Sequence, residues 1–404
     1  MSVLSTTILG HLIEQRTLGL NRASSTSPEV AETNSPTSPD SPNGTDAPEI
    51  RRSVSAESIF SSAGSGVGTA PQSADPYETG TYFNPDKEFL LQPDDRLSFS
   101  IRYPNIYRHC VKQRAQHWFE HEVKFLPTDR YDWDNKLNND QRYFLKHVLA
   151  FFAASDMIVN DNLAQRFAQE VQLVEAQHTY RQQMAIEDIH SIVYANLIEG
   201  YIKDKTEKEK LFNAVRTFPV IAAKAAWCRK WMNSDRPFCE RLAAFAIVEG
   251  VFFAGSFAAI FWMAEKGLLP AMRKANEFIA RDESMHVLFA IELYSNLKTK
   301  TPLTILSRIF KEAVELETDF IVNAIPCKMV GMSAQDMTIY IRYTANRLFK
   351  MMTGTELFEK VHNPFPFMDR IALENKSNFF EKDVTNYTKM QNEEDPTEDA
   401  FSDL

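Results

Sequence analysis

Four Glu-x-x-His pairs mark the residues of this sequence that could do chemistry. Residues three apart share one face of a helix, so each pair would place a carboxylate beside an imidazole. The pairs are Glu175/His178, Glu187/His190, Glu283/His286 and Glu359/His362. The motif alone is weak evidence, and at least some of the four are incidental.

Two pairs differ from the others, because each follows a segment with one isolated acid in an apolar run. These acids are Asp156, in HVLAFFAASDMIV, and Glu249, in LAAFAIVEGVFFAGSFAAIFWMA.

The same unit, an acid and then Glu-x-x-His, occurs twice. Asp156 precedes Glu187 by 31 residues and Glu249 precedes Glu283 by 34, and each interval suits one helix, a turn and an antiparallel return. A four-helix bundle with one acid on each of two helices and Glu-x-x-His on each of the others is the pattern of dinuclear carboxylate metal sites. A buried carboxylate needs a partner charge or a metal, and these helix faces supply no basic residue. Four carboxylates and two imidazoles suit iron or manganese. We therefore predict two metal ions per chain, either iron or manganese.

The other two pairs lack this context. Glu175 lies 12 residues before Glu187, which on a helix points it about 120° away from the Glu187 face. Glu359/His362 abuts Asn363-Pro364, where a helix must end. Both pairs are interpreted as surface or terminal residues.

One tyrosine shares a helix face with a predicted ligand pair. Tyr194 lies seven residues after Glu187 and four after His190, so it sits one turn beyond the histidine. Three apolar residues on the partner helices are expected to enclose it: Phe253, Phe257 and Ile279. A buried tyrosine near a metal is by itself more often packing than redox chemistry.

The elements that must position these residues are long helices. From about Phe83 to Asn378, apolar residues recur at three- and four-residue spacing, and breaks fall at Pro and Gly, which predicts an all-α bundle. The apolar run 242–264 is long enough to cross a bilayer. It is rich in Ala, Gly and Phe and is the one such segment, so we expect the central helix of a bundle and no membrane span.

Composition limits the remaining functions. The net charge of −10 argues against a nucleic-acid-binding surface. The four cysteines form no C-x-x-C pair, which fits a reducing compartment. The N-terminus lacks a basic start and a sustained apolar core, so we expect no secretory signal and a cytoplasmic protein.

Polar segments flank the predicted bundle. Residues 1–82 are rich in Ser, Thr, Pro and Gly and are predicted to be a disordered extension. Residues 83–378 form the predicted bundle domain, and residues 379–404 are expected to be a flexible acidic tail that ends in the apolar anchors Phe401 and Leu404.

Several long stretches closely resemble the small, radical-generating subunit of class I ribonucleotide reductase. They are FFAASDMIVNDNL, AIEDIHSIVY, AIVEGVFFAGSFAAIFW and RDESMH, and the similarity spans roughly 85–390. The resemblance implies a ferritin-like helical homodimer whose di-iron centre activates oxygen and oxidises a tyrosine to a stable radical. It assigns one iron to Asp156, Glu187 and His190, and the other to Glu249, Glu283 and His286, with Glu187 and Glu283 as bridges. Met157 departs from the Gly of many relatives, but this removes no ligand.

The resemblance also assigns residues beyond the ligands. Tyr194 matches the radical tyrosine, Asp282 the acid that orients His190, and Trp118 the tryptophan of the electron-transfer path. Tyr387 matches the tail tyrosine that relays the radical to the large catalytic subunit, on which Phe401 and Leu404 would dock. The implied activity is the reduction of ribonucleoside diphosphates to deoxyribonucleotides for DNA synthesis, by an enzyme active only with that large subunit.

Two other readings stay open on the residues alone. One is a ferritin-like ferroxidase or oxidase on the same metal site. The other is a non-catalytic paralogue that stabilises a reductase partner. The presence of Tyr194, Trp118 and Tyr387 together with a complete ligand set argues against both.

Overall fold

The computed structural model describes residues 79–369, except 233, 325 and 360, and within them the regular structure is helical, with no strand. The prediction of an all-α fold is confirmed. The α-helices are α3 (Pro104–Ala115), α4 (Pro127–Tyr131), α5 (Asn139–Asn162), α6 (Ala168–Glu170), α7 (Val174–Tyr201), α8 (Lys205–Phe212), α9 (Ala214–Thr217), α10 (Pro219–Trp231), α11 (Phe238–Ile247), α12 (Ala254–Ala264), α13 (Pro270–Asn296), α14 (Leu303–Thr318) and α15 (Ala334–Thr353).

Short turns of other helical types join these helices. The 3₁₀ turns are η1 (Pro85–Lys87), η2 (Phe89–Leu91), η3 (Glu120–Glu122) and η8 (Cys327–Val330). The π-helical turns are η4 (Asp132–Lys136), η5 (Leu163–Phe167), η6 (Val248–Phe252) and η7 (Asp319–Ala324). A π-helical turn holds one residue more than an α-helical turn and often occurs at functional sites.

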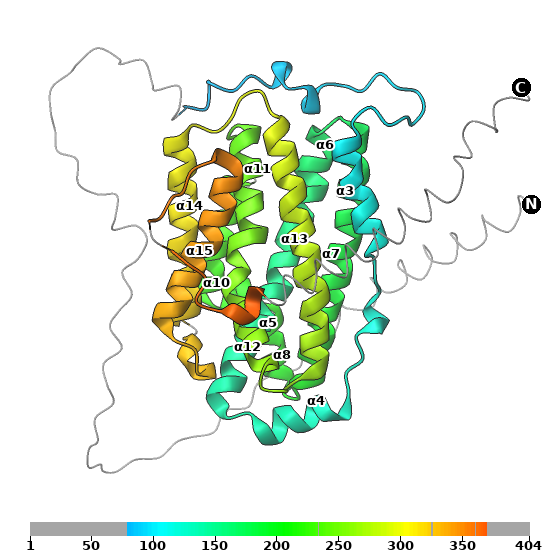
Figure 1. Cartoon of the computed structure of the whole chain (residues 1–404). Coiled ribbons are helices and arrows are strands. Elements are labelled where there is room, and N and C mark those ends of the chain that lie inside the picture. The colour runs from blue at the N-terminus through cyan, green and yellow to red at the C-terminus, as the bar shows by residue number, and fades with distance from the viewer. Residues whose placement is uncertain (1–78, 233, 325, 360, 370–404) are drawn as a thin grey trace, which may run out of the picture. The chain divides into compact units, whose positions relative to one another are not determined.

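The long helices lie side by side as a bundle (Figure 1). Helix α5 packs against α7, α7 packs against α3, and the run α11–η6–α12 packs against α13. Helices α14 and α15 pair with each other and cover α11, η6 and α12, while α10 fills the space beside α5, α11 and α14. The four elements that carry the predicted ligands are therefore enclosed by other helices.

Side chains cap the helices that matter most for the site. At the start of α5, Asn138 accepts a hydrogen bond from the Gln141 backbone N–H, and the Gln141 side chain accepts one from the Asn138 N–H. This reciprocal arrangement satisfies two N–H groups that a helix start leaves unpaired. It fixes the beginning of the helix that carries Asp156.

The start of α13 is held by two buried acids that lie far earlier in the sequence, in α4 and η4. Leu269 has a left-handed backbone with φ 56°, which is rare for a leucine. Its N–H donates to Asp132 Oδ2 at 3.1 Å, and the Ala271 N–H donates to Asp129 Oδ1 at 2.9 Å. Negative charge at a helix N-terminus is favourable, and Tyr201 OH also donates to Asp129. These contacts tie the start of α13 to the end of α7.

The apolar run lies inside the bundle. The segment Phe238–Ala264 is long and apolar enough to cross a membrane, with mean hydropathy 2.0 over its most apolar stretch, but 94% of that stretch is buried in the protein. The expected central helix is present. It is interrupted at η6, so its two halves, α11 and α12, are out of α-helical register.

The chain before α3 is less helical than the sequence indicated. Residues 83–103 cross one end of the bundle (Figure 1). Their regular structure consists of the 3₁₀ turns η1 and η2. The Arg96 guanidinium donates to both Glu175 oxygens, at 2.8 and 2.6 Å, and the Arg102 N–H donates to Glu175 Oε1 at 2.7 Å. Glu175 is fully buried, so its interpretation as a surface residue is wrong.

The fourth Glu-x-x-His pair has no helix to present it. Helix α15 ends at Thr353, where Gly354 takes φ 77°, as a glycine that ends a helix commonly does. Glu359 and His362 are both exposed beyond that end. They lie outside the cluster described below.

Candidate metal centre

Six predicted side chains come together in the middle of the bundle. Helix α5 supplies Asp156, α7 supplies Glu187 and His190, η6 supplies Glu249, and α13 supplies Glu283 and His286. All six are at most 3% exposed. Their ligand atoms fall into two overlapping sets, each within 4.8 Å: Glu187, Glu249, Glu283 and His286 in one, and Asp156, Glu187 and His190 in the other.

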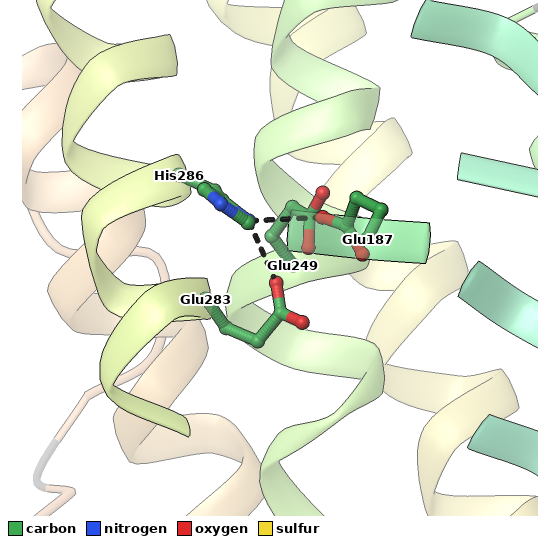
Figure 2. Close-up of side chains that lie close together, drawn as sticks. All are labelled: Glu187, Glu249, Glu283 and His286. Atoms are coloured by element: carbon green, nitrogen blue, oxygen red, sulfur yellow. Dashed lines mark hydrogen bonds and ion pairs between the residues drawn. The ribbon is translucent and has the colours of Figure 1, made fainter. Parts of the chain in front are cut away.

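The two histidines face the same two glutamates. His286 Nδ1 lies 3.0 Å from Glu187 Oε1 and 3.1 Å from Glu283 Oε2 (Figure 2). His190 Nδ1 lies 3.3 Å from Glu187 Oε2 and 3.2 Å from Glu283 Oε1. Glu187 and Glu283 thus each direct one oxygen to either imidazole, which is the placement that a pair of bridging carboxylates needs.

Proton affinities in the cluster are strongly displaced. Burial, together with the charge of Glu187, raises the pKa of Asp156 well above its ordinary value, and burial together with Glu283 raises that of Glu249. Burial alone would lower the pKa of His286, but the charges of Glu187 and Glu283 outweigh it and raise the value to about 9. Without a cation, the cluster therefore holds protons that reduce its negative charge. Metal ions compete with such protons for the same atoms.

The donor set fits a pair of metal ions. Each of the six side chains has a buried polar atom that makes no hydrogen bond of acceptable geometry in the described part of the chain, although three of these atoms face an oppositely charged group at 3.0–3.3 Å. The atoms are Asp156 Oδ2, Glu187 Oε1, His190 Nδ1, Glu249 Oε2, Glu283 Oε1 and His286 Nε2. Buried polar atoms are rarely left unpaired. Carboxylate oxygens and imidazole nitrogens in this number are suitable ligands for two divalent ions of iron or manganese.

An outer hydrogen-bond chain leads away from one histidine. His190 Nε2 lies 3.2 Å from Asp282 Oδ2, and Trp118 Nε1–H donates to the same oxygen at 2.6 Å. Arg281 Nε and Nη2 donate to the other oxygen of Asp282, and Nη2 also donates to the Gln116 carbonyl. An acid on the far nitrogen of a metal-binding histidine fixes the ring and its tautomer.

Tyr194 is fully buried and stacks on an aromatic ring. Its ring stacks on Phe152 with 4.7 Å between centroids and an interplanar angle of 1°. Phe152 in turn lies 5.3 Å from Phe253 and 4.9 Å from Phe257. The two predicted phenylalanines thus contact Phe152, and Phe152, which the sequence interpretation missed, is the ring that stacks on Tyr194. Ile279, the third predicted wall residue, is buried on α13.

The Tyr194 hydroxyl has an amide partner that was also missed. It donates to Asn276 Oδ1 at 2.9 Å, and Asn276 Nδ2 donates to the Met272 carbonyl at 2.8 Å. Burial raises the pKa of Tyr194 well above its ordinary value, and the nearby charge of Asp156 adds to this. The phenol is therefore held protonated. The available signal was that Asn276 precedes Glu283 by seven residues and so shares its face of α13.

Gln183 is a third residue that the sequence interpretation missed. It is fully buried one turn before Glu187, and its Nε2 donates to Glu249 Oε1 at 3.4 Å. A polar residue four positions before a ligand is the signal that could have found it. Three other predicted residues, Tyr387, Phe401 and Leu404, lie outside the described residues.

Comparison with known proteins places the same core in one family. Residues 97–364 match the family described as "Ribonucleotide reductase, small chain". The protein is 47% identical over 301 residues to a ribonucleoside-diphosphate reductase small subunit of Dictyostelium discoideum, covering 74% of this protein and 88% of the relative. It is 46% identical over 306 residues to one of the small subunits of the same enzyme from Arabidopsis thaliana, covering 76% of this protein and 91% of that relative.

Solved structures share the fold. The ribonucleotide reductase Rnr4 homodimer of Saccharomyces cerevisiae aligns with TM-score 0.66 and 32% identity, over 75% of this protein and 93% of that one. Streptococcus sanguinis dimanganese(II)-NrdF aligns with TM-score 0.57 and 16% identity, over 66% of this protein and 94% of that one. These neighbours bear out the predicted ferritin-like helical bundle.

Proposed function

The chain belongs to the family of ribonucleotide reductase small chains, and from that membership we propose that Tyr194 is the residue that this subunit oxidises to a radical. The protein is accordingly a subunit of an oxidoreductase that works together with a large subunit. The radical would serve the reduction of ribonucleoside diphosphates, the substrates that the names of its relatives state. The expected localisation is the cytoplasm.

Two metal ions are proposed at the six-residue cluster, with iron as the expected metal. Asp156, Glu187 and His190 would hold one ion, and Glu249, Glu283 and His286 the other. Iron bound there would supply the oxidising chemistry, with dioxygen as the oxidant. On each of the six side chains, a buried polar atom that makes no hydrogen bond supports this proposal.

The observation that carries the radical proposal is the environment of the Tyr194 hydroxyl. Tyr194 is fully buried, its hydroxyl donates a hydrogen bond to a neutral amide, and its ring stacks on Phe152. A neutral amide oxygen is a poor proton acceptor, so the proton that leaves an oxidised phenol must go elsewhere. The complete burial of Tyr194 would keep water and small reductants away from the radical.

The hydrogen-bond chain from His190 through Asp282 to Trp118 supports a route for the electron away from the metal centre. Trp118, Asp282 and His190 are linked by contacts of 2.6 and 3.2 Å. Trp118 would carry the radical from the metal side toward Tyr387, and Tyr387 would relay it to the large subunit. Phe401 and Leu404 are the proposed anchors on that partner, and a homodimer is the proposed assembly.

The tyrosine assignment is tested with Tyr194→Phe. Wild-type protein reconstituted with ferrous iron and oxygen should give a tyrosyl radical signal by electron paramagnetic resonance, whereas the variant should give none and should bind as much metal. Tyr201→Phe is the matched control, because Tyr201 is equally buried on α7 and its hydroxyl donates to Asp129. A radical signal that persists unchanged in Tyr194→Phe would place the radical elsewhere.

The metal assignment is tested by stoichiometry. Wild-type protein should bind about two ions per chain, as this class of site does. Glu249→Ala should lower that number, because it removes one of the four carboxylates. Glu359→Ala should leave it unchanged, since Glu359 is exposed and outside the cluster. Metal analysis by atomic emission decides, and equal metal content in the two variants would contradict the assignment.

A further inference from the structure

A buried ion pair lies behind the turn that carries Glu249. Lys224 on α10 and Glu317 on α14 are 1% and 0% exposed, and Lys224 Nζ lies 2.5 Å from Glu317 Oε2. Three phenylalanine rings surround the ammonium group, with centroids 3.5 Å (Phe151), 4.2 Å (Phe320) and 4.8 Å (Phe252) away. Neither member of the pair belongs to the metal cluster.

The π-helical turn η6 sets where the Glu249 carboxylate points. It inserts one extra residue into the helix between α11 and α12. A shift of one residue along a helix rotates a side chain by about 100°. If η6 relaxed to α-helical register, Glu249 would turn away from Glu283 and His286. Whatever holds η6 in place therefore also positions this ligand.

The ion pair binds the backbone at the end of that turn. Lys224 Nζ donates to the Phe252 carbonyl at 2.9 Å, and Phe252 is the last residue of η6. The Gly255 N–H donates to Glu317 Oε1 at 3.2 Å. One partner thus holds a carbonyl of the π turn, and the other holds an amide in the first turn of α12.

The glycine makes this contact sterically feasible. A Cβ atom at position 255 would come within 2.6 Å of Glu317 Oε1 and 3.1 Å of Ile321 Cγ2. Any larger residue would push the carboxylate away from the backbone of α12. Position 255 therefore requires glycine, because the Glu317 carboxylate lies too close to leave room for a Cβ atom.

The pair is more than packing. Replacing a buried ion pair by apolar residues of similar volume is often neutral or even stabilising, so stability alone does not account for it. Directional hydrogen bonds to two backbone groups do what an apolar pair could not, because they fix the register of one turn. We propose that Lys224 and Glu317 are positioning residues that hold η6 so that Glu249 reaches the metal centre.

The proposal rests on the proposed metal site, and cobalt(II) binding tests the two separately. Wild-type protein should take up two Co(II) ions per chain, followed by calorimetry and by the visible absorption of Co(II). If wild type binds none, the proposed function fails, whatever the role of the pair.

The test variant is Lys224→Met/Glu317→Leu, which leaves no unpaired buried charge. Losing an outer partner of a metal ligand weakens metal binding by about 10–100-fold. We expect a loss of about this size for the ion at Glu249, Glu283 and His286. The ion at Asp156, Glu187 and His190 should keep its affinity. Because the two ions would then differ in affinity, the Co(II) titration should show two separate steps. A folded double variant that binds both ions like wild type would overturn the proposal.

Two further variants complete the test. Glu175→Gln is the control, because it disturbs a buried ion pair that does not touch η6; it should melt at a lower temperature and still bind both ions in one step. A two-step titration of this control would attribute the effect to general destabilisation and overturn the proposal. If the double variant does not fold, Glu317→Gln decides. It keeps the size of the side chain, and wild-type affinity for both ions would then refute the proposal.

Discussion

At the scale of single residues, the Tyr194 hydroxyl depends on one amide. Asn276 accepts its hydrogen bond and is itself held by the Met272 carbonyl. The amide is neutral, so it can orient the phenol without raising or lowering the charge of the pocket. The orientation of the Tyr194 hydroxyl therefore does not depend on whether the nearby carboxylates are protonated.

Asn276→Ala should weaken both the fold and the radical. The Tyr194 hydroxyl would be left buried and unpaired, which costs about 1–3 kcal/mol of the free energy of unfolding. Urea denaturation of metal-free protein should show this loss. Paramagnetic resonance should show a lower radical yield with a changed line shape, while metal content stays at the wild-type level.

The matched control for this change is Asn346→Ala. Asn346 is also buried and also bonds through its side chain, to the backbone of Leu357 and Phe358. Its loss should destabilise the protein without affecting the radical signal. Equal radical yields in the Asn276 and Asn346 variants would exclude a role for Asn276 beyond stability.

At the scale of elements, the long helices could be predicted because their apolar periodicity and their caps are local in sequence. The grouping of the six metal-cluster residues could be predicted because their spacing repeats. Phe152 and Asn276 were missed because apolar and amide residues on a helix face look alike whether or not they touch a tyrosine. The π turn η6 was missed because one inserted residue leaves no mark in an apolar run. Glu175 was misjudged because its partner, Arg96, lies 79 residues away.

Glu175 should make the fold sensitive to acid. Burial would raise its pKa, but the bonds from Arg96 and the backbone outweigh this and lower it to about 2, from an ordinary 4.5. The carboxylate therefore stabilises the folded state above about pH 4.5, and this contribution is lost as pH falls toward 2. Its size is on the order of 2–3 kcal/mol.

Glu175→Gln reveals this contribution. The difference in unfolding free energy between wild type and the variant should be largest near pH 5 and should shrink toward pH 2. Urea titrations of metal-free protein at several pH values measure it, with the exposed Glu359→Gln as the control. A difference that stays constant over this range would rule out a pH-dependent role for the Arg96–Glu175 pair.

At the scale of the whole molecule, the metal centre is deeply enclosed, yet the proposed function requires a partner. The described helices carry the residues proposed for the oxidation chemistry, while the proposed docking residues Phe401 and Leu404 and the proposed relay residue Tyr387 belong to residues 379–404. Radical formation and radical delivery are thereby assigned to different parts of one chain, so they should be separable by mutation.

Deleting Ala400–Leu404 should abolish reductase activity with the large subunit and leave metal content and radical signal intact. Tyr387→Phe should act differently: binding to the large subunit persists, the radical forms, and turnover stops. Sedimentation with the large subunit, paramagnetic resonance and a turnover assay distinguish the two. A peptide of the last residues should compete with full-length protein. Normal turnover by the truncated chain at low concentration would show that docking lies elsewhere.

The buried run Phe238–Ala264 also has a consequence for biosynthesis. Three of the helices that cover it, α13, α14 and α15, follow it in the chain, so the ribosome synthesises the run before them. At a translation rate of roughly 5–20 residues per second, residues 270–353 are completed on the order of 10 s after the run itself. During that time, a segment with the length and hydropathy of a membrane span is open to aggregation and to misreading by the membrane-insertion machinery. Nascent chains of this protein should therefore depend on ribosome-associated chaperones until α15 emerges.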